Sequence, residues 1–348
     1  MKYIITNRLR TILIIFTFFC MSAGCELVDN IRGGEDEETV SLHPILLNGE
    51  WGYIDNNGSI VIPPQFETAR DFSNGYAAVR SNQSWGFINE STKQLTVQPS
   101  FNIVGNFNEN GLTQAQALGE PYGFINTSGE FAIPAQYDLA LEFSESRAAV
   151  RVDGQWGFID ETGNMIIETT FSDARSFSEG LAAVETVNGW VYIDLSGEII
   201  INPNFQITTA LDFSEGLAPI QTTDGWGFID INGAPIITPE FDEAGVFSEG
   251  LAWLRDDDYI GFVDKEGTFA IDFQFGEAKN FSEDLAAVRL SSNWYYVNRR
   301  TGRLQFARGF SEAESFTNGV ARITEGSDDD PRFGYINKKG EYIWFPTQ

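Results

Sequence analysis

The stretch that decides the fold is residues 156–189, which read WGFIDETGNMIIETTFSDARSFSEGLAAVETVNG. A period of two places Trp156 and Phe158 on one face of a strand, with Gly157 and Ile159 on the other. The Asp-Glu-Thr-Gly sequence at 160–163 is typical of a turn, because Asp can bond to the backbone two residues on and Gly tolerates a positive φ. The stretch therefore predicts short strands joined by tight turns.

The same pattern recurs along the chain at intervals of 34 to 39 residues. Its anchors, each a bulky residue that opens a strand, are Trp51, Trp85, Tyr122, Trp156, Trp190, Trp226, Ile260, Trp294 and Phe333. A second landmark, a Phe followed by a polar turn, runs in step with the first from Phe72 to Phe316. Two landmarks with one period indicate eight full repeats and a partial ninth.

The turn chemistry predicts an all-β domain over residues 42–348. Asn-Gly or Asp-Gly pairs, which are strong hairpin signals, precede several anchors at 48–49, 153–154, 188–189 and 224–225. No window shows an apolar period of 3.6 over ten residues. Because one such unit cannot bury its apolar face alone, neighbouring units must stack and share a core.

The repeat resembles the WG repeat family of bacterial proteins. Residues 226–252 carry nearly the full pattern, and the resemblance covers residues 43–348. It implies a tandem-repeat fold, and it implies neither a general enzymatic activity nor a fixed ligand. The copies that begin at Tyr122, Ile260 and Phe333 lack the Trp, so a role for Trp in every repeat does not carry over.

Two architectures fit such a repeat: an open β-solenoid or superhelix of short antiparallel hairpins, and a closed β-propeller ring. A unit of about 35 residues is short for a four-stranded blade, and nine starts with eight full units is an awkward count for closure. We therefore expect the open solenoid, with the propeller as the alternative.

The first residues predict an exported, lipid-anchored protein. A basic start is followed by an apolar run at 12–21, which is shorter than the ~20 residues of a membrane-spanning helix. Ser22-Ala23-Gly24 then precedes Cys25, and this junction resembles the lipobox of bacterial lipoproteins, with Ser22 where Leu is usual. The resemblance implies a signal peptide over 1–24, acylation of Cys25, and attachment to the bacterial cell envelope at the outer membrane or cell surface. The Gly-rich, acidic segment that follows predicts a flexible tether over 25–41.

Composition excludes several functions. The chain has 50 acidic and 22 basic residues, a net charge of −28, so it would repel nucleic-acid phosphate. The same charge disfavours direct adsorption to an anionic membrane, which leaves the N-terminal lipid as the membrane contact. One His and two Cys offer little for His-rich or Cys-rich metal sites, and no cofactor is expected.

Motifs for catalysis are absent from the sequence. His43 would have to serve any Ser-His-Asp triad, and no Gly-x-Ser-x-Gly elbow supplies the nucleophile. We expect His43 to be a solvated residue at the edge of the first strand. Acids such as Glu179, Glu215, Glu249 and Glu283 recur at one repeat position, which indicates turn chemistry. The sequence does not predict an enzyme.

Local departures from the repeat are the candidates for binding. Asp256, Asp257 and Asp258 form a weak candidate calcium site, although a solvated hairpin is favoured because their spacing does not match the twelve-residue calcium loop. The candidate exposed aromatic contacts are Trp253, Tyr295, Tyr296 and Trp344.

The sequence predicts a non-catalytic envelope protein that binds an unknown protein partner through an extended acidic β surface, and the charge favours a basic partner. The alternative is binding of a glycan or the cell wall through exposed aromatic residues of the repeats.

Overall fold

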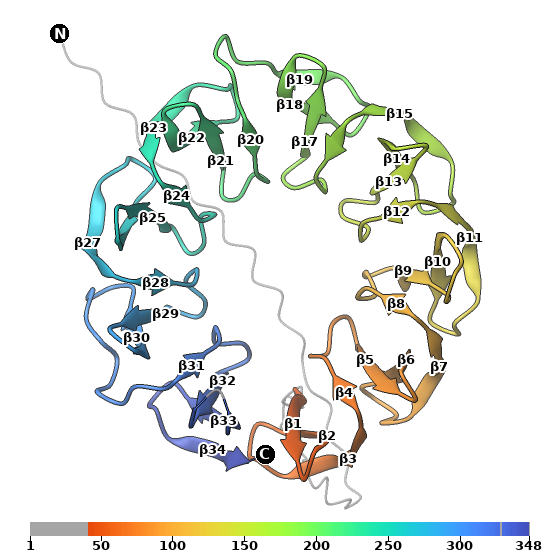
Figure 1. Ribbon diagram of the computed structural model, residues 1–348, viewed down its shortest axis with the longest axis vertical. Coiled ribbons are helices and arrows are strands. Elements are labelled where there is room, and N and C mark those ends of the chain that lie inside the picture. The colour runs from red at the N-terminus through yellow and green to blue at the C-terminus, as the bar shows by residue number, and fades with distance from the viewer. Residues whose placement is uncertain (1–40, 328, 348) are drawn as a thin grey trace, which may run out of the picture. The chain divides into compact units, whose positions relative to one another are not determined.

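The computed structural model describes residues 41–327 and 329–347, and its regular elements there are all β-strands. They form nine antiparallel sheets, seven with four strands and two with three. The sheets follow one another around a closed ring, seen face-on in Figure 1. This part of the chain is a nine-bladed β-propeller, whose blades we number 1 to 9 in chain order. None of the described residues lies in a helix long and apolar enough to cross a membrane.

Each regular blade has a short inner strand towards the ring centre and a longer second strand beside it (Figure 1). The inner strands are β4 (Thr68–Ala69), β8 (Ile103–Val104), β12 (Leu139–Ala140), β16 (Asp173–Ala174), β20 (Thr209–Ala210), β24 (Glu243–Ala244), β28 (Glu277–Ala278) and β31 (Glu312–Ala313). The second strands are β1 (His43–Leu47), β5 (Tyr76–Ser81), β9 (Leu112–Gln116), β13 (Ala148–Val152), β17 (Leu181–Thr186), β21 (Leu217–Thr222), β25 (Ala252–Asp256), β29 (Leu285–Leu290) and β32 (Val320–Glu325).

The third strand of each blade carries the anchor residue, and the fourth lies at the rim of the ring. The third strands are β2 (Glu50–Ile54), β6 (Ser84–Asn89), β10 (Tyr122–Asn126), β14 (Gln155–Ile159), β18 (Gly189–Asp194), β22 (Gly225–Asp230), β26 (Tyr259–Val263), β30 (Asn293–Asn298) and β33 (Arg332–Asn337). The outer strands are β3 (Ile60–Phe66), β7 (Leu95–Phe101), β11 (Phe131–Tyr137), β15 (Met165–Phe171), β19 (Ile199–Ile201), β23 (Pro235–Phe241), β27 (Phe269–Phe275) and β34 (Tyr342–Thr347).

A sequence repeat and a blade are out of step by half a unit. The repeat that begins at Trp156 supplies the third and outer strands of blade 4, then the inner and second strands of blade 5. The crossing is tight, because a single residue separates the end of β15 at Phe171 from the start of β16 at Asp173. Each repeat therefore joins two neighbouring blades covalently.

The expected open solenoid is wrong, and the alternative of a closed propeller is correct. About 35 residues suffice for a four-stranded blade because the inner strand has two residues. The partial ninth repeat supplies β33 and β34, which complete blade 9. At the other end of the described chain, β1 is the second strand of blade 1. Nine starts are therefore compatible with nine blades in the ring.

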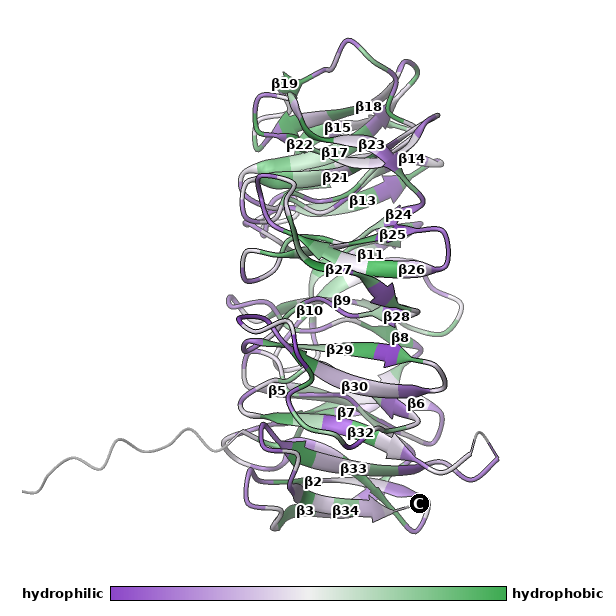
Figure 2. Cartoon of the chain, turned by 90° about the vertical axis from the view of Figure 1, so that its left-hand side faces the viewer, coloured by the Kyte–Doolittle hydropathy of each residue, from purple (hydrophilic) through white to green (hydrophobic). Residues whose placement is uncertain are grey.

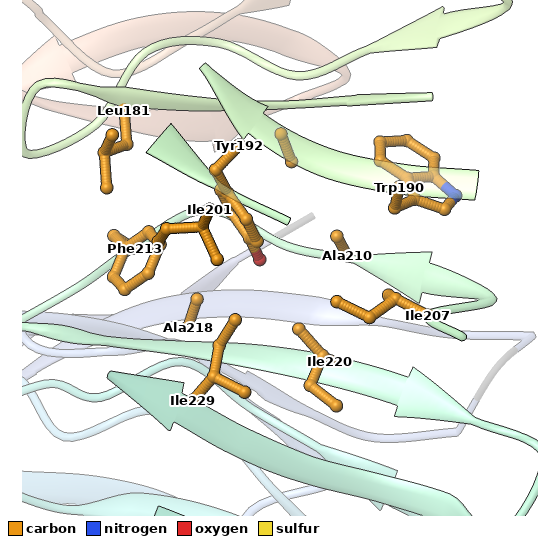
Figure 3. Close-up of a cluster of buried hydrophobic side chains, with 11 residues drawn as sticks. Leu181, Trp190, Tyr192, Ile201, Ile207, Ala210, Phe213, Ala218, Ile220 and Ile229 are labelled. Carbon is orange, nitrogen blue, oxygen red and sulfur yellow. The ribbon is translucent and has the colours of Figure 1, made fainter. Parts of the chain in front are cut away.

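The hydrophobic core lies between blades, in a series of similar clusters. In the cluster shown in Figure 3, Trp190 and Tyr192 of blade 5 face Phe213 and Ile220 of blade 6. Small residues such as Ala218 in the same cluster let the sheets approach closely. Large aromatic residues and small Ala residues therefore pack together across this interface.

The Gly that follows the anchor allows the outer strand to cross it. A Cβ atom on Gly157 would lie 2.5 Å from the carbonyl oxygen of Ile167 in β15. The register between β14 and β15 shifts at this point, between Trp156 and Phe158, as in a β-bulge. A side chain here would push the outer strand away.

Two blades lack this Gly, and both have a defective outer strand. Val191 takes its place in blade 5, where β19 has three residues instead of the seven of β15. Tyr295 takes its place in blade 8, and within the described residues that blade has three strands and no outer one. The size of this one side chain therefore correlates with the length of outer strand that pairs.

The strands cross the thickness of the ring, and the turns lie at its two faces, where hydrophilic residues gather (Figure 2). One face carries the hairpins between second and third strands, such as that at 153–154. The other carries the Phe-Ser-Glu-Gly turns at 177–180 and equivalent positions, together with the Asp-x-x-Gly turns. We call the second face the FSEG face.

Candidate functional site

In most interfaces the FSEG turn binds the next blade through its Ser. Ser178 Oγ donates a hydrogen bond to the carbonyl oxygen of Phe213, 2.7 Å away, and Ser214 Oγ donates to Phe247 O at 2.7 Å. The same bond recurs from Ser144, Ser248 and Ser282. The Ser of the motif is therefore a link between blades.

The Glu of the turn makes a second link of the same kind. Glu179 Oε2 accepts a hydrogen bond from the backbone N–H of Gly216 at 2.8 Å. The backbone of Glu179 itself has a φ of 55°, in the left-handed region. Glu145, Glu215, Glu249 and Glu283 accept equivalent bonds from the next turn along the ring. The recurrent acids are thus structural in origin, as their repetition predicts.

The Asp-x-x-Gly turns hold their carboxylates in the ionised form. The Thr162 hydroxyl and the backbone N–H groups of Thr162 and Asn164 donate to Asp160, which lowers its pKa to about 2. Bonds from Ser196 lower the pKa of Asp194 in the same way. These turns account for part of the acidity without forming a site.

The ring closes at a seam between blades 9 and 1 by a different set of contacts. Blade 1 has three strands, and no described residue forms an inner strand beside β1. Two carbonyl groups of β1 are bonded by side chains of blade 9: Tyr335 Oη donates to Pro44 O at 2.8 Å, and Thr347 Oγ1 donates to Leu46 O at 2.7 Å. In blade 2 the corresponding carbonyls accept from backbone N–H groups of β4 and its flanks. Side chains thus replace a strand.

A cavity of about 380 Å³ occupies the seam. Blade 1 contributes Leu42 and His43 to its wall, and blade 9 contributes Arg322 and Tyr335. Blade 2 contributes Asp71, Phe72, Asn74, Gly75 and Glu90. The remaining lining residues are Ser41 and, from blade 9, Glu314, Ser315, Thr317, Asn318 and Val320. We call this the seam cavity, and its volume is at the lower end of the range for small-ligand sites.

Two residues of the cavity wall replace alanine of the repeat. His43 pairs with Ile54 as Ala77 pairs with Ile88, and Arg322 pairs with Tyr335 as Ala78 pairs with Phe87. His43 is buried, with 6% of its surface exposed, so the expectation of a solvated residue is wrong. Its Nε2 lies 2.7 Å from Asn56 Oδ1, and its ring centre lies 5.5 Å from that of Tyr335. Its place at the closure, which the local sequence does not reveal, explains the burial.

The acidic residues near blades 2 to 4 are not neutralised within the described chain. Two further cavities, of about 350 and 310 Å³, adjoin the seam cavity through the shared residues Asp71 and Asn74. The second includes Glu109, Glu142 and Glu161 in its wall, and its described lining contains no Lys or Arg. The surroundings of the 310 Å³ cavity therefore present free negative charge, whereas the wall of the 350 Å³ cavity includes Arg70 and Arg322.

Several acids of the FSEG turns around blades 6 to 9 are paired. Lys265 Nζ lies 3.0 Å from Glu215, and Lys338 Nζ lies 2.8 Å from Glu283. Arg299 bonds Asp284 at 2.7 Å and lies 3.6 Å from Glu249. The FSEG face is thus divided into a neutralised part and an unneutralised one.

A family model described as the WG containing repeat matches residues 51–83, 85–117, 122–156, 156–190, 190–225, 226–259 and 260–294. The chain belongs to this family. Each match begins in a third strand and ends either between the second and third strands of the next blade or at the start of that third strand, so a WG repeat spans two blades. No curated protein sequence matches the chain.

Solved structures resemble the WG repeat ring in fold. The crystal structure of the eukaryotic initiation factor matches with a TM-score of 0.65 and 12% identity, covering 89% of this chain and 97% of its own. Dihydro-heme d1 dehydrogenase NirN in complex with DHE matches with a TM-score of 0.52 and 11% identity, covering 79% of this chain and 74% of its own. At these identities the likeness concerns the fold alone.

The WG anchors are packing residues. Trp156, Trp190 and Trp294 are buried, and the remaining aromatic anchors are half-buried beside the interface clusters or strand pairs. Basic groups cover three of them: Arg70 lies 4.4 Å from the ring centre of Trp85, with similar contacts at Trp190 and Trp294. The regular Trp residues therefore do not form an open platform.

The four candidate contact residues have different environments. Tyr296 is fully buried and its hydroxyl donates to Glu314 O at 2.7 Å, so its assignment to an exposed surface is wrong. Trp253 and Tyr295 are half-buried and pack on one cluster between blades 7 and 8. Trp253 occupies space opened by Gly245, where a Cβ atom would lie 2.2 Å from its Nε1. Trp344 is half-buried at the seam and donates to Thr347 Oγ1 at 3.0 Å.

The other candidate positions give no site. Asp256, Asp257 and Asp258 lie at the hairpin between β25 and β26, and the backbone N–H of Asp257 donates to Asp242. Within the described chain no three His, Cys, Asp or Glu residues are grouped to hold a metal ion. The predicted signal peptide, Cys25, and the tether before Ser41 lie outside the described residues.

Asp71, Glu90 and Arg322 were not singled out from the sequence. Arg322 could have been found, because it stands where an aligned second strand has Ala149, Ala183 or Ala287. Asp71 and Glu90 carry no such signal, since acids are common at turns throughout the chain.

Proposed function

We propose that this WG repeat protein is a non-catalytic, lipid-anchored component of the bacterial cell envelope that binds a basic protein partner. The observation that carries the proposal is the unneutralised side of the FSEG face, where Glu109, Glu142 and Glu161 line a cavity whose described wall has no basic residue. Opposite charge on a partner would speed association and favour this side of the ring over the paired one.

The anchoring part of the proposal rests on Ser22-Ala23-Gly24 before Cys25. Acylation there would hold the protein at the membrane, since each buried CH₂ contributes about 0.8 kcal/mol and several chains bind stably. Mass spectrometry of the N-terminal peptide from envelope fractions tests this part. An unmodified Cys25, or cleavage at another residue, contradicts it.

The binding part is tested with the full-length chain in detergent, against solubilised envelope proteins at low and high salt. Retention of a basic protein at low salt and its loss at high salt is the expected result. The double variant Glu109→Gln/Glu161→Gln should weaken retention. The control Glu67→Gln/Glu240→Gln removes the same charge from exposed positions elsewhere. Equal retention by both variants contradicts the proposed surface.

A second candidate function is glycan binding through the half-buried pair Trp253 and Tyr295, which pack on the same cluster. Aromatic faces that are partly exposed can stack against sugars. Titration with peptidoglycan fragments should then quench Trp fluorescence with little salt dependence, and Trp253→Ala should abolish the change without unfolding. Salt-sensitive protein binding with no such quenching favours the first function.

A further inference from the structure

We propose that the seam cavity is a socket for one arginine side chain of the basic partner, an inference that rests on the proposed function. The cavity, of about 380 Å³, has room for one long side chain rather than a folded segment. Its position is unique in the described ring, because the other eight blades place an inner strand beside the second strand. The opening is thus built by the closure of the ring.

The wall offers apolar surface for the stem of an arginine. Leu42, Phe72, Val320 and Tyr335 all line the cavity. Tyr335 is held by its hydrogen bond to Pro44 O, so its ring is a fixed part of the wall. Long basic side chains characteristically lay their methylene groups along such surfaces while the charged end remains near polar groups.

The wall holds three carboxylates and one histidine as hydrogen-bond acceptors, beside hydroxyl and amide side chains and Arg322. His43 is more than nine-tenths buried, and the one hydrogen bond of its side chain within the described chain joins Nε2 to Asn56 Oδ1. Because Asn56 Oδ1 is an acceptor, Nε2 carries the hydrogen, which makes Nδ1 an acceptor in the neutral ring. Asp71 and Glu90 add carboxylates that form no ion pair with any described residue.

These acceptors fit a guanidinium better than other cations. A guanidinium carries five N–H donors in a planar fork, which can reach separated acceptors at once, whereas an ammonium is a compact point charge. Arg322 is the basic group in the described wall, and it lies 3.8 Å from Glu314, which Lys279 also contacts. Asp71 and Glu90 therefore leave net negative charge available to a ligand.

The single histidine of the chain supplies a direct test. The full-length protein in detergent, labelled with ¹³C at histidine Cε1, should give one ring signal, from His43. Acetyl-Gly-Arg-Gly-amide should shift this signal saturably at constant pH. The citrulline peptide, which is nearly isosteric but uncharged, should bind at least tenfold more weakly, and the lysine peptide should also bind more weakly than arginine.

Paired variants locate the effect. Asp71→Asn/Glu90→Gln should reduce affinity for the arginine peptide at least tenfold, and Asp224→Asn/Glu240→Gln, with the same net charge, should leave it within twofold. Thermal unfolding checks that each variant folds, and Asp71→Asn alone serves if the double variant does not.

Equal binding of the citrulline or lysine peptide, or an unchanged affinity of the Asp71→Asn/Glu90→Gln variant, overturns the socket. If that variant also retains the basic envelope protein in a salt-sensitive way, the proposed function survives while the socket fails. If no basic protein is retained by the wild type, the proposed function itself fails.

Discussion

The interface between blades 5 and 6 and the seam between blades 9 and 1 join similar sheets by different means. At the first, the chain crosses from β19 towards β20, Ser178 bonds Phe213 O, and a cluster of eleven buried residues fills the space. At the seam, within the described residues, two side-chain hydrogen bonds replace the inner strand, and the buried cluster comprises Ile45, Ile54, Val320 and Tyr335.

The difference shows how a repeat ring closes when its ends are not covalently joined. Packing of the third and outer strands continues across the seam: Gly58 lies against Ile343 as Gly233 lies against Ile201. On the inner side no described residue forms a strand beside β1, and that is where the cavity lies. The rim therefore preserves the repeat geometry, while the ring centre carries the exception.

The largest expected effect comes from removing the Phe of the turn in a filled interface, compared with the same change beside the seam. Phe213→Ala removes a ring that is 1% exposed and should lower the free energy of unfolding by about 3–5 kcal/mol. Phe72→Ala, at the equivalent position beside the seam cavity, should cost less than half as much because Phe72 is half-buried. Urea unfolding measures both. Equal losses would mean that the seam is packed as tightly as the other interfaces.

A matched pair of glycines tests the rim contact at the seam. Gly58 and Gly75 have φ values of +82° and +79°, so substitution of either by Ala should cost about 1–2 kcal/mol of backbone strain. A Cβ atom on Gly58 would also lie 2.2 Å from Ile343 O, whereas Gly75 has nothing within 4 Å. Gly58→Ala should therefore cost about 1–3 kcal/mol more in urea unfolding. An equal cost would contradict closure at this contact.

The Tyr335 hydroxyl tests the inner side of the seam. Tyr335→Phe leaves the buried Pro44 carbonyl without its donor and should cost about 2 kcal/mol. Tyr192→Phe, which loses the same kind of bond to Leu211 O, is the control in a regular interface. Hydrogen exchange should show faster exchange near β1 in the first variant and not in the second. Faster exchange throughout the ring in both would remove the distinction between seam and regular interface.

The Ser link between regular blades should give a smaller effect. Ser214→Ala removes the bond to Phe247 O and should cost about 1 kcal/mol. On the blade 9 side of the seam the same position is Thr317, whose hydroxyl forms no hydrogen bond with another described residue. Thermal unfolding should show the same loss of stability for Ser214→Ala and for Ser178→Ala, which removes the equivalent bond one interface earlier. No loss in either would show that the link is dispensable.

Acid should weaken the regular blades through their turns. The fold favours ionised Asp160, Asp194 and Asp230, whose pKa values are lowered, to about 2 for Asp160. Their stabilisation is present above the pKa of the unfolded chain, near 4, and is lost as pH falls towards 2. In Asp160→Asn, the free energy of unfolding should fall slightly less between pH 5 and pH 2 than it does in the wild type. A steeper decline in the variant would contradict the assignment.

Much of the fold could be predicted from particular residues. The anchors and the Phe-Ser-Glu-Gly turns gave the repeat length, the all-β class and nine starts, because each local turn and strand depends on nearby residues. The burial of Tyr296 and the fit of Trp253 over Gly245 could not be predicted, since each depends on a residue from another strand. His43 was misread for the same reason: the blade that buries it comes from the other end of the chain.

The sequence by itself determined the repeating unit, the strands within it, and the turn role of its recurrent Glu, whereas the link that the recurrent Ser makes between blades came from the structure. Ring closure was decided by the tertiary structure, because it depends on the small rotation accumulated between successive blades, which no single repeat records. The same closure created the seam cavity and brought His43, Asp71 and Arg322 together from blades 1, 2 and 9. Local residue patterns specify a blade, and the sum of nine interfaces specifies the ring.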